Sequence, residues 1–327
     1  MQKKSILLIA PNYFGYDHLI KTFLQESGNK VDLLPDRPLN SNFGKALIRL
    51  SRRFAFPVAN KFFKEKITDL QRETYDVVWV IQGEGVSPEL LIWLREKYSK
   101  ASFIWYLWDS FENKPALKEN LPFFDKVYTF DPKDAVDNNI GFQPLFFSPS
   151  YANLIHSERK FDLCFIGTGH ADRFQIVSAL KKTFTEKQFF TFIFLQTPII
   201  YFFRRIFDKN LKDSKYSDFS FNKMSQKQVQ DIVSQADIII DVQHPDQRGL
   251  TMRTLETMGA RKKLVTTNTE IRNYDFYDER NICIIDRKLP TIPNSFFNNL
   301  FNPLPNHINE KYSIRGFVKS MLGEEFV

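Results

Sequence analysis

Residues 236–268 read ADIIIDVQHPDQRGLTMRTLETMGARKKLVTTN, and this stretch decides the fold class. An almost wholly apolar run, 236–242, comes first and suits a buried strand. Residues 251–260 then alternate apolar and charged side chains at helical spacing, and a second apolar run occupies 262–268. A strand, a helix and a strand in this order predict part of a parallel sheet whose faces are covered by helices.

The same alternation fills the N-terminal half of the chain. Helical patterns occur at 18–26 and after Ser87, where a serine N-cap followed by proline is a start signal. We therefore expect residues 1–150 to form one doubly wound α/β domain. Its strands are predicted from the apolar runs at 5–10, 30–35, 76–81, 102–108, 126–130 and 142–147.

The pattern restarts after a polar linker at 148–160. Residues 151–305 are predicted to form a second Rossmann-like domain, and 306–327 a C-terminal helix able to pack back on the first domain. The expected fold is α/β, with two Rossmann-like domains facing a central cleft, because open parallel sheets bind ligands beyond the carboxyl ends of their strands. The strands expected in the second domain are 161–167, 189–195, 236–242, 262–268 and 281–286.

Composition narrows the class of function without choosing it. The chain has 327 residues and a net charge of +7, which suits phosphate-bearing ligands, an anionic membrane surface or nucleic acid. No run of five or more basic residues occurs, which argues against a nucleic-acid partner. Cys164 and Cys283 lie inside apolar runs, as buried thiols of a reducing compartment do. No apolar stretch reaches about 18 residues, so we expect a cytoplasmic protein without a membrane-spanning helix.

A glycine-containing loop, GTGHADR at 167–173, follows a predicted strand and opens a helix. Backbone N–H groups in such a loop can approach a phosphate, and the helix dipole favours an anion. Asp172 stands where dinucleotide-binding loops carry their third glycine, so a dinucleotide cofactor is not favoured. The alternative is a plain tight turn with a solvated arginine. The candidate phosphate contacts are Gly167, Thr168, Gly169, His170 and Arg173.

The junction between strand 236–242 and the following helix supplies a second set of candidates. Arg253 and Glu256 are three residues apart, so they share a helix face near its positive end. An arginine there can bind a diphosphate, and a carboxylate can bind ribose hydroxyls. The alternative is an ordinary salt bridge on a solvated helix. The candidates are His244, Arg248, Gly249, Thr251 as N-cap, Arg253 and Glu256.

The arrangement ADIIIDV…GLTMRTLETMGARKKLVTTN resembles the donor-binding region of GT-B glycosyltransferases, in particular the CgeB-like group and lipopolysaccharide and capsule biosynthesis transferases. MSQKQVQDIVSQADIIIDV fits the same pattern, and FDKVYTFDPKDAVDNNIGFQPLFF resembles the end of that group's first domain. By this resemblance Glu256 matches the glutamate that binds the nucleotide ribose. Many retaining members carry a second glutamate at the position of Arg248, so the stereochemical outcome stays open.

The resemblance implies transfer of a sugar from a nucleotide-sugar to a saccharide or lipid-linked acceptor, in bacterial surface polysaccharide synthesis. It implies neither a bound metal nor another cofactor. The His244-Pro245 pair keeps CMP-linked donors open beside UDP-, GDP- and dTDP-sugars. Two alternatives stay open: a sugar-nucleotide epimerase of the same architecture, and a non-catalytic nucleotide-binding scaffold.

The acceptor and the catalytic base are expected from the first domain. An inverting transfer needs a carboxylate or histidine that takes the proton of the acceptor hydroxyl. Glu84 in QGEG and Asp109 in YLWDS directly follow apolar strands, and His18 follows the first strand. Each of the two carboxylates has an ordinary alternative, as an N-cap or as a surface turn residue.

Two segments mix basic residues with apolar and aromatic ones, ALIRLSRRFAFPVANKFFKEK at 46–66 and PIIYFFRRIF at 198–207. Such segments can lie in the lipid headgroup layer, which predicts peripheral contact with the inner face of the cell membrane. The alternative is a pair of helices packed on the sheets with basic outer faces.

Overall fold

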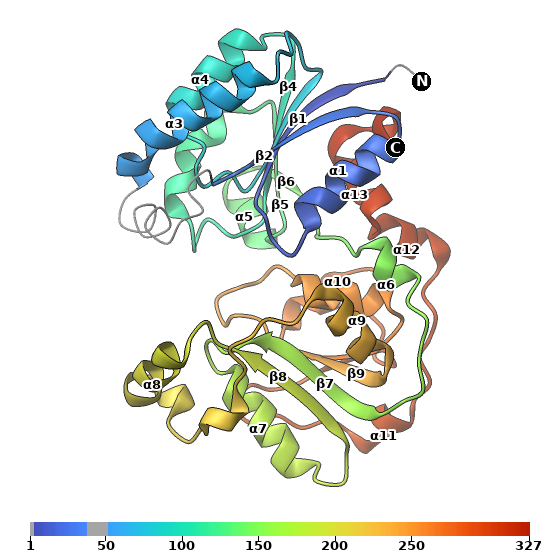
Figure 1. The fold of residues 1–327 in the computed structure, drawn as a ribbon. Coiled ribbons are helices and arrows are strands. Elements are labelled where there is room, and N and C mark those ends of the chain that lie inside the picture. The colour runs from blue at the N-terminus through green and yellow to red at the C-terminus, as the bar shows by residue number, and fades with distance from the viewer. Residues whose placement is uncertain (1–2, 38–51) are drawn as a thin grey trace. The chain divides into compact units, whose positions relative to one another are not determined.

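The computed structural model describes residues 3–37 and 52–327 (Figure 1). The chain divides into two compact units, Met1–Leu145 with Ile314–Val327, and Phe146–Ser313. Each unit is built on one sheet whose neighbouring strands all pair in parallel. Helices alternate with the strands, which confirms the predicted α/β fold with two Rossmann-like domains.

The first unit holds a six-stranded sheet in the order β2-β1-β3-β4-β5-β6. Its strands are β1 (Ser5–Ala10), β2 (Lys30–Pro35), β3 (Val77–Ile81), β4 (Ser102–Leu107), β5 (Lys126–Thr129) and β6 (Gly141–Phe142). Its helices are α1 (Tyr16–Glu26), α3 (Arg52–Asp69), α4 (Pro88–Lys97), α5 (Pro132–Asp137) and α13 (Ile314–Leu322), with the 3-10 segments η1 (Pro115–Phe123) and η5 (Glu324–Phe326).

Side chains of this sheet alternate between two packed layers, because successive residues of a strand point to opposite faces. Val78 and Val80 join a core with Phe63 of α3. On the other face, Phe317 of α13 packs against Trp79 and Tyr106, with ring centroids 6.0 and 5.0 Å apart. Figure 1 shows α3 and α4 on one side of the sheet and α1 and α13 on the other. The last residues of the chain therefore complete the first unit.

The second unit holds a five-stranded sheet in the order β11-β10-β9-β7-β8. Its strands are β7 (Phe161–Thr168), β8 (Phe189–Phe194), β9 (Ala236–Asp241), β10 (Lys263–Thr266) and β11 (Ile282–Ile284). Its helices are α6 (Pro149–Ala152), α7 (Arg173–Thr183), α8 (Pro198–Phe207), α9 (Gln226–Ser234), α10 (Met252–Gly259), α11 (Asn294–Asn298) and α12 (Asn306–Lys311), with η2 (Lys209–Leu211), η3 (Tyr216–Asp218) and η4 (Thr269–Asn273).

The residues predicted to start two helices do so in the structure. Ser87 accepts a hydrogen bond from the backbone N–H of Leu90 at 3.0 Å. Thr251 accepts one from Thr254 at 3.2 Å, so both are side-chain N-caps. These caps fix where α4 and α10 begin, after the loops that follow β3 and β9.

Two predicted elements differ from the structure. Of the strand expected at 142–147 only β6 pairs in the first sheet, because Phe147 donates its backbone N–H to Tyr312 at 3.0 Å within the second unit. The helix expected near the C-terminus is broken between α12 and α13, where Ser313 forms a bridge with Phe147. The unit boundaries therefore fall at residues 145 and 314, a few residues from the boundaries expected at 150 and 306.

The two basic, aromatic segments also differ from one another. Residues 46–51 lie outside the described residues. Further along the first segment, α3 buries Ala59, Phe63 and Ile67 in the core of the first unit. Helix α8 of the second segment buries only Tyr201. Among the described residues, no helix is both long and apolar enough to cross a bilayer.

Candidate functional sites

The carboxyl ends of β7, β9 and β11 lie along one edge of the second sheet, because all its strands run in parallel. The loop 167–173 follows β7, residues 242–251 follow β9, and Arg287 follows β11. Two of these three segments were predicted to bind the donor. This edge is therefore the first candidate site.

Arg173, the first residue of α7, ties two strand ends together. Its Nε donates to the carbonyl of Val242 at 2.6 Å, and its Nη1 donates to the hydroxyl of Thr168 at 3.0 Å. In the described part of the chain these bonds leave Nη2 unused. Burial lowers the pKa of Arg173; Asp241 opposes this effect and Arg287 adds to it. The guanidinium groups of Arg173 and Arg287 lie close enough for the charge of Arg287 to lower the pKa of Arg173, and two neighbouring cations favour an anion at this edge.

Two further arginines frame the same edge. Arg287 donates to both carboxylate oxygens of Asp172, at 2.6 and 2.8 Å, and to the carbonyl of Gln243 at 2.5 Å. Arg204 of α8 donates to the carbonyl of Gly169 and pairs with Asp208 at 2.6 Å. Three guanidinium groups thus hold the loops that follow β7 and β9. The sequence did not place Arg204 or Arg287 at this edge, because their contacts with Gly169 and Asp172 span 35 and 115 positions.

His170 lies in this positive field as a neutral side chain. Burial lowers its pKa to about 3, and Arg173 and His244 act in the same direction. The rings of His170 and His244 have centroids 5.9 Å apart. Among the described residues, Nδ1 of His170 is buried without a hydrogen-bond partner. A buried ring nitrogen in this state is available to a ligand.

The start of α10 is fixed by a buried carboxylate. Asp241 accepts hydrogen bonds from the hydroxyls of Thr251 and Thr254 at 2.5 and 2.7 Å. Asn268, which follows β10, donates to the carbonyl of Arg248 at 3.0 Å. The side chain of Arg248 itself is exposed and Gly249 is buried. The loop 242–251 therefore has a defined path at the strand edge.

Arg253 and Glu256 form a buried pair, so the solvated salt bridge considered as an alternative is wrong. Their side chains are 2.8 Å apart and only 19% and 10% exposed. Nη1 of Arg253 also donates to the hydroxyl of Tyr151 in α6 at 3.4 Å. Burial works to lower the pKa of Arg253, but Glu256 and Tyr151 outweigh it and raise that pKa. Nε of Arg253 is buried without a partner in the described residues.

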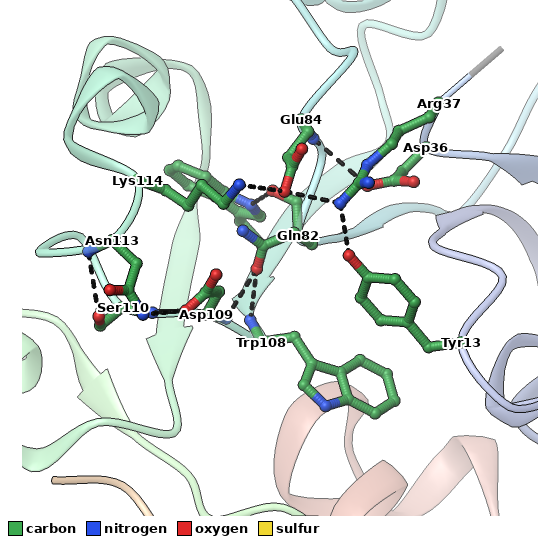
Figure 2. A network of polar contacts seen from close by, with 11 residues as sticks. Tyr13, Asp36, Arg37, Gln82, Glu84, Trp108, Asp109, Ser110, Asn113 and Lys114 are labelled. Carbon is green, nitrogen blue, oxygen red and sulfur yellow. Dashed lines mark hydrogen bonds and ion pairs between the residues drawn. The ribbon is translucent and has the colours of Figure 1, made fainter. Parts of the chain in front are cut away.

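A second polar cluster lies in the first unit, around the turn that follows β3 (Figure 2). Glu84 is almost fully buried, and its Oε1 accepts from Arg37 Nη2 at 2.7 Å and lies 3.0 Å from Lys114 Nζ. Arg37 also donates to the hydroxyl of Tyr13. Two cations thus hold the carboxylate of Glu84.

Asp36 is the member of this cluster that the sequence reasoning missed. It follows β2 directly and is 2% exposed, and its carboxylate accepts from the backbone N–H of Glu84 at 3.3 Å. Burial raises the pKa of Asp36 to about 7, although Arg37 opposes this. Its place directly after a predicted strand, the signal that singled out Glu84 and Asp109, would have found it.

Gln82 links the cluster to the end of β4. Its backbone has a φ of 60°, which non-glycine residues rarely adopt, and its side chain is 1% exposed. Oε1 of Gln82 accepts from the backbone N–H groups of Trp108 and Asp109 at 2.9 and 2.8 Å. Nε2 is buried without a partner among the described residues. Strained backbone of this kind persists where its surroundings hold it, often at functional sites.

Asp109 is half-buried at the edge of this cluster. Its Oδ1 accepts from Ser110 N at 2.9 Å and from Asn113 Nδ2 at 2.8 Å, which leaves Oδ2 out of these bonds (Figure 2). His18 instead lies exposed on α1, 3.7 Å from Asp17. The structure thus brings Glu84 and Asp109 into one network and leaves His18 outside it.

Within the described ranges, no three His, Cys, Asp or Glu side chains gather in a geometry that could hold a metal ion. Both cysteines are buried and free.

No family model and no curated protein matches this chain. Solved structures match it along nearly its whole length. An α-glucosyltransferase in complex with UDP and a mismatched 13-mer DNA has 12% identity and a TM-score of 0.58, covering 99% of this chain and 94% of that one. The avilamycin A biosynthesis glycosyltransferase AviGT4 has 11% identity and a TM-score of 0.55, covering 99% and 97%.

A third structure, HepE from Anabaena in complex with UDP and glucose, has 10% identity and a TM-score of 0.51, covering 97% of this chain and 95% of that one. At such low identity these likenesses speak for the fold alone. They agree with the two parallel sheets described above and place the chain's fold, with its two Rossmann-like domains, among those of GT-B glycosyltransferases.

Proposed function

We propose that the protein is a glycosyltransferase that takes a sugar from a nucleotide-sugar donor. The observation that carries this proposal is the arginine-framed strand edge of the second unit, where Arg173 Nη2 makes no bond within the described residues. Arginine binds phosphate oxygens through paired, charge-assisted hydrogen bonds. The fold neighbours solved with UDP support a uridine nucleotide as the first donor to test.

In this proposal the diphosphate lies against Arg173 and the N-terminus of α7, an 11-residue helix whose dipole favours an anion there. Neutral His170 offers its ring nitrogen to the same ligand. Glu256 holds the ribose, and Arg253 fixes the position of the Glu256 carboxylate. Gly167, Thr168, Gly169, His244, Arg248, Gly249 and Thr251 line the remaining contacts. The arginines stabilise the charge of the departing nucleotide, the step at which preorganised cations contribute most.

We assign the proton acceptor of the first unit to Asp109, in preference to Glu84 and His18. Oδ2 of Asp109 is not used by Ser110 or Asn113. Glu84 is instead held by two cations. A carboxylate with one fixed and one available oxygen is positioned to take the proton of an acceptor hydroxyl.

The cellular setting is also a proposal. We place the protein in the cytoplasm at the inner face of the membrane, in the CgeB-like group, with a saccharide or lipid-linked acceptor of lipopolysaccharide or capsule synthesis. The basis is the motif 236–268. No metal enters the proposed reaction, since charge neutralisation is assigned to arginines.

The first experiment measures the thermal midpoint with UDP, GDP, dTDP, CDP and CMP, each with and without EDTA. A ligand that binds only the folded state raises its stability by about 2.7 kcal/mol at a hundredfold excess over its dissociation constant. Arg173→Lys keeps the charge but loses Nη2, so nucleotide affinity should fall ~10- to 100-fold. Arg280→Lys, at an exposed ion pair with Asp278, is the matched control and should bind normally.

The second experiment measures transfer by Asp109→Asn. Turnover should fall ~100-fold or more while nucleotide affinity stays unchanged. Binding without any turnover in the unaltered protein would favour a scaffold. Donor turnover without acceptor would favour an epimerase, and an unchanged midpoint with every nucleotide would refute the donor site.

A further inference from the structure

Helix α8 leaves most of its apolar side chains in solvent. Ile199, Phe202, Phe203, Ile206 and Phe207 are between 54% and 79% exposed. Their spacing of three and four residues puts them on one stripe of the helix. We call these five residues the α8 apolar face. Single exposed apolar residues are ordinary on a protein surface, but five on one short helix mark an interaction surface.

The opposite side of α8 is firmly attached to the second unit. Tyr201 is 1% exposed and donates its hydroxyl hydrogen to the carbonyl of Ser214 at 3.2 Å. Thr197 caps the helix by accepting from the backbone N–H of Ile200 at 3.3 Å. The Tyr201 ring also contacts Phe219, with centroids 5.3 Å apart. These contacts fix the orientation of the helix, so its apolar face points away from the second unit.

The surroundings of this face are basic. Arg205 lies on α8 itself, and Lys209, Lys212 and Lys215 follow it, all exposed. The acidic residues nearby are mostly engaged, since Asp208 pairs with Arg204 and Asp218 accepts from the backbone N–H of Lys215 at 2.7 Å. A stripe of Phe and Ile flanked by exposed cations matches a lipid bilayer, whose anionic headgroups lie directly above an apolar layer.

We propose that α8 docks this protein on an anionic lipid surface, lying in the plane of the headgroups with its apolar face inserted. This proposal identifies α8 as the surface that makes the membrane contact proposed above. Its evidence comes from α8 alone and does not depend on a nucleotide or a sugar. β8, which leads into α8, is an edge strand of the second sheet, and Figure 1 shows α8 at the margin of this unit.

The docked helix would also touch the candidate donor site. Nη1 of Arg204 donates to the carbonyl of Gly169 in the loop after β7. A lipid surface that fixes α8 therefore fixes one wall of the arginine-framed edge. In this proposal the lipid surface lies on the same side of the second unit as the candidate donor site.

The test measures flotation of the full chain with vesicles of phosphatidylcholine alone and with about one-third phosphatidylglycerol. The chain should bind the anionic vesicles at least ~10-fold more tightly, and binding should weaken as salt is raised. The double variant Phe203→Gln/Ile206→Gln should lose ~10-fold or more of this binding. The matched control is Ile155→Gln/Leu289→Gln, which removes two even more exposed apolar side chains elsewhere in the second unit and should bind normally.

A charge variant, Arg205→Gln/Lys209→Gln, should lose the preference for anionic vesicles and keep the weaker binding to neutral ones. The proposal is overturned if the Phe203/Ile206 variant binds like the unaltered chain, or if the chain binds neither vesicle. It is also overturned if sedimentation shows a dimer that this variant abolishes, since a second copy then covers the face. Nucleotide-induced thermal shifts should be the same in all variants, which separates this inference from the donor site.

Discussion

Replacing Asp36 by Asn should flatten the dependence of the first unit's stability on pH. The carboxyl of Asp36 is 2% exposed, and burial raises its pKa from 3.8 to about 7. The neighbouring groups are Arg37, which lowers this pKa, and Glu84, which raises it. A buried carboxyl with such neighbours is most compatible with the fold when it is protonated.

The sign of the effect follows from the raised pKa. Asp36 contributes its full stabilisation below pH 3.8, and this contribution is lost as pH rises through about 7, because the unfolded chain releases the proton first. A difference of about three pKa units corresponds to roughly 4 kcal/mol in total. About half of that, ~2 kcal/mol, is lost between pH 5.5 and 8. Asn keeps the size and the acceptor for Glu84 but cannot ionise.

The assay is urea unfolding followed by tryptophan fluorescence at pH 5.5 and pH 8. All four tryptophans, Trp79, Trp93, Trp105 and Trp108, lie in the first unit, so their fluorescence reports that unit alone. Between pH 5.5 and pH 8 the unfolding free energy of the unaltered chain should fall by ~2 kcal/mol more than that of Asp36→Asn.

Asp125→Asn is the control for this experiment. Burial acts to raise the pKa of Asp125, but hydrogen bonds from Arg95 and from the backbone of Phe103 outweigh burial and lower it. Its titration therefore lies below the tested window, and this variant should keep the slope of the unaltered chain. An equal slope in Asp36→Asn and the unaltered chain would refute the reasoning about Asp36.

Three further changes should act in the second unit. Gly259→Ala should destabilise it by ~1–3 kcal/mol in urea unfolding followed by circular dichroism, because the added Cβ would lie 2.6 Å from a ring carbon of Phe147; a gain in stability would show that the segment moves freely. Thr251→Ala should cost about 1–2 kcal/mol by loss of the N-cap and of its bond to Asp241, whereas Thr251→Ser should cost much less. Acidification from pH 7.5 to 5 should destabilise His170→Gln by ~2 kcal/mol less than the unaltered chain. The pKa of His170, lowered to about 3, gives stability above pH 6.5 that is lost as pH falls. Amide hydrogen exchange of β7 and α7 measures this loss, and an equal loss in both chains would place His170 in solvent.

Much of the fold followed from local pattern. The apolar runs at 5–10, 30–35 and 161–167 became strands with bounds that match within one residue. The run at 142–147 misled because Phe146 and Phe147 are buried without belonging to a sheet. An apolar run indicates burial, and burial in a loop gives the same signal as burial in a strand.

Contacts within the candidate sites were predictable where the two residues are close in sequence. The spacing of Arg253 and Glu256 predicted that they meet, and they do. Arg287 contacts Asp172 across 115 positions, and no local pattern carries such a contact. Asp36 directly follows a predicted strand and could have been found by that signal, but its contact with the turn at Glu84, 48 residues away, follows no local pattern. Strand-end position was the useful signal, since parallel strands bring distant loops to one edge.

The most direct test of the proposed donor site is amide hydrogen exchange of the full chain with and without saturating UDP. We expect slower exchange in the loop 167–173 and in residues 242–251, with the strand-end cluster of the first unit unchanged. Slower exchange confined to the first unit, or no change anywhere under conditions where UDP-sugar is turned over, would contradict the assignment of the nucleotide to the arginine-framed edge.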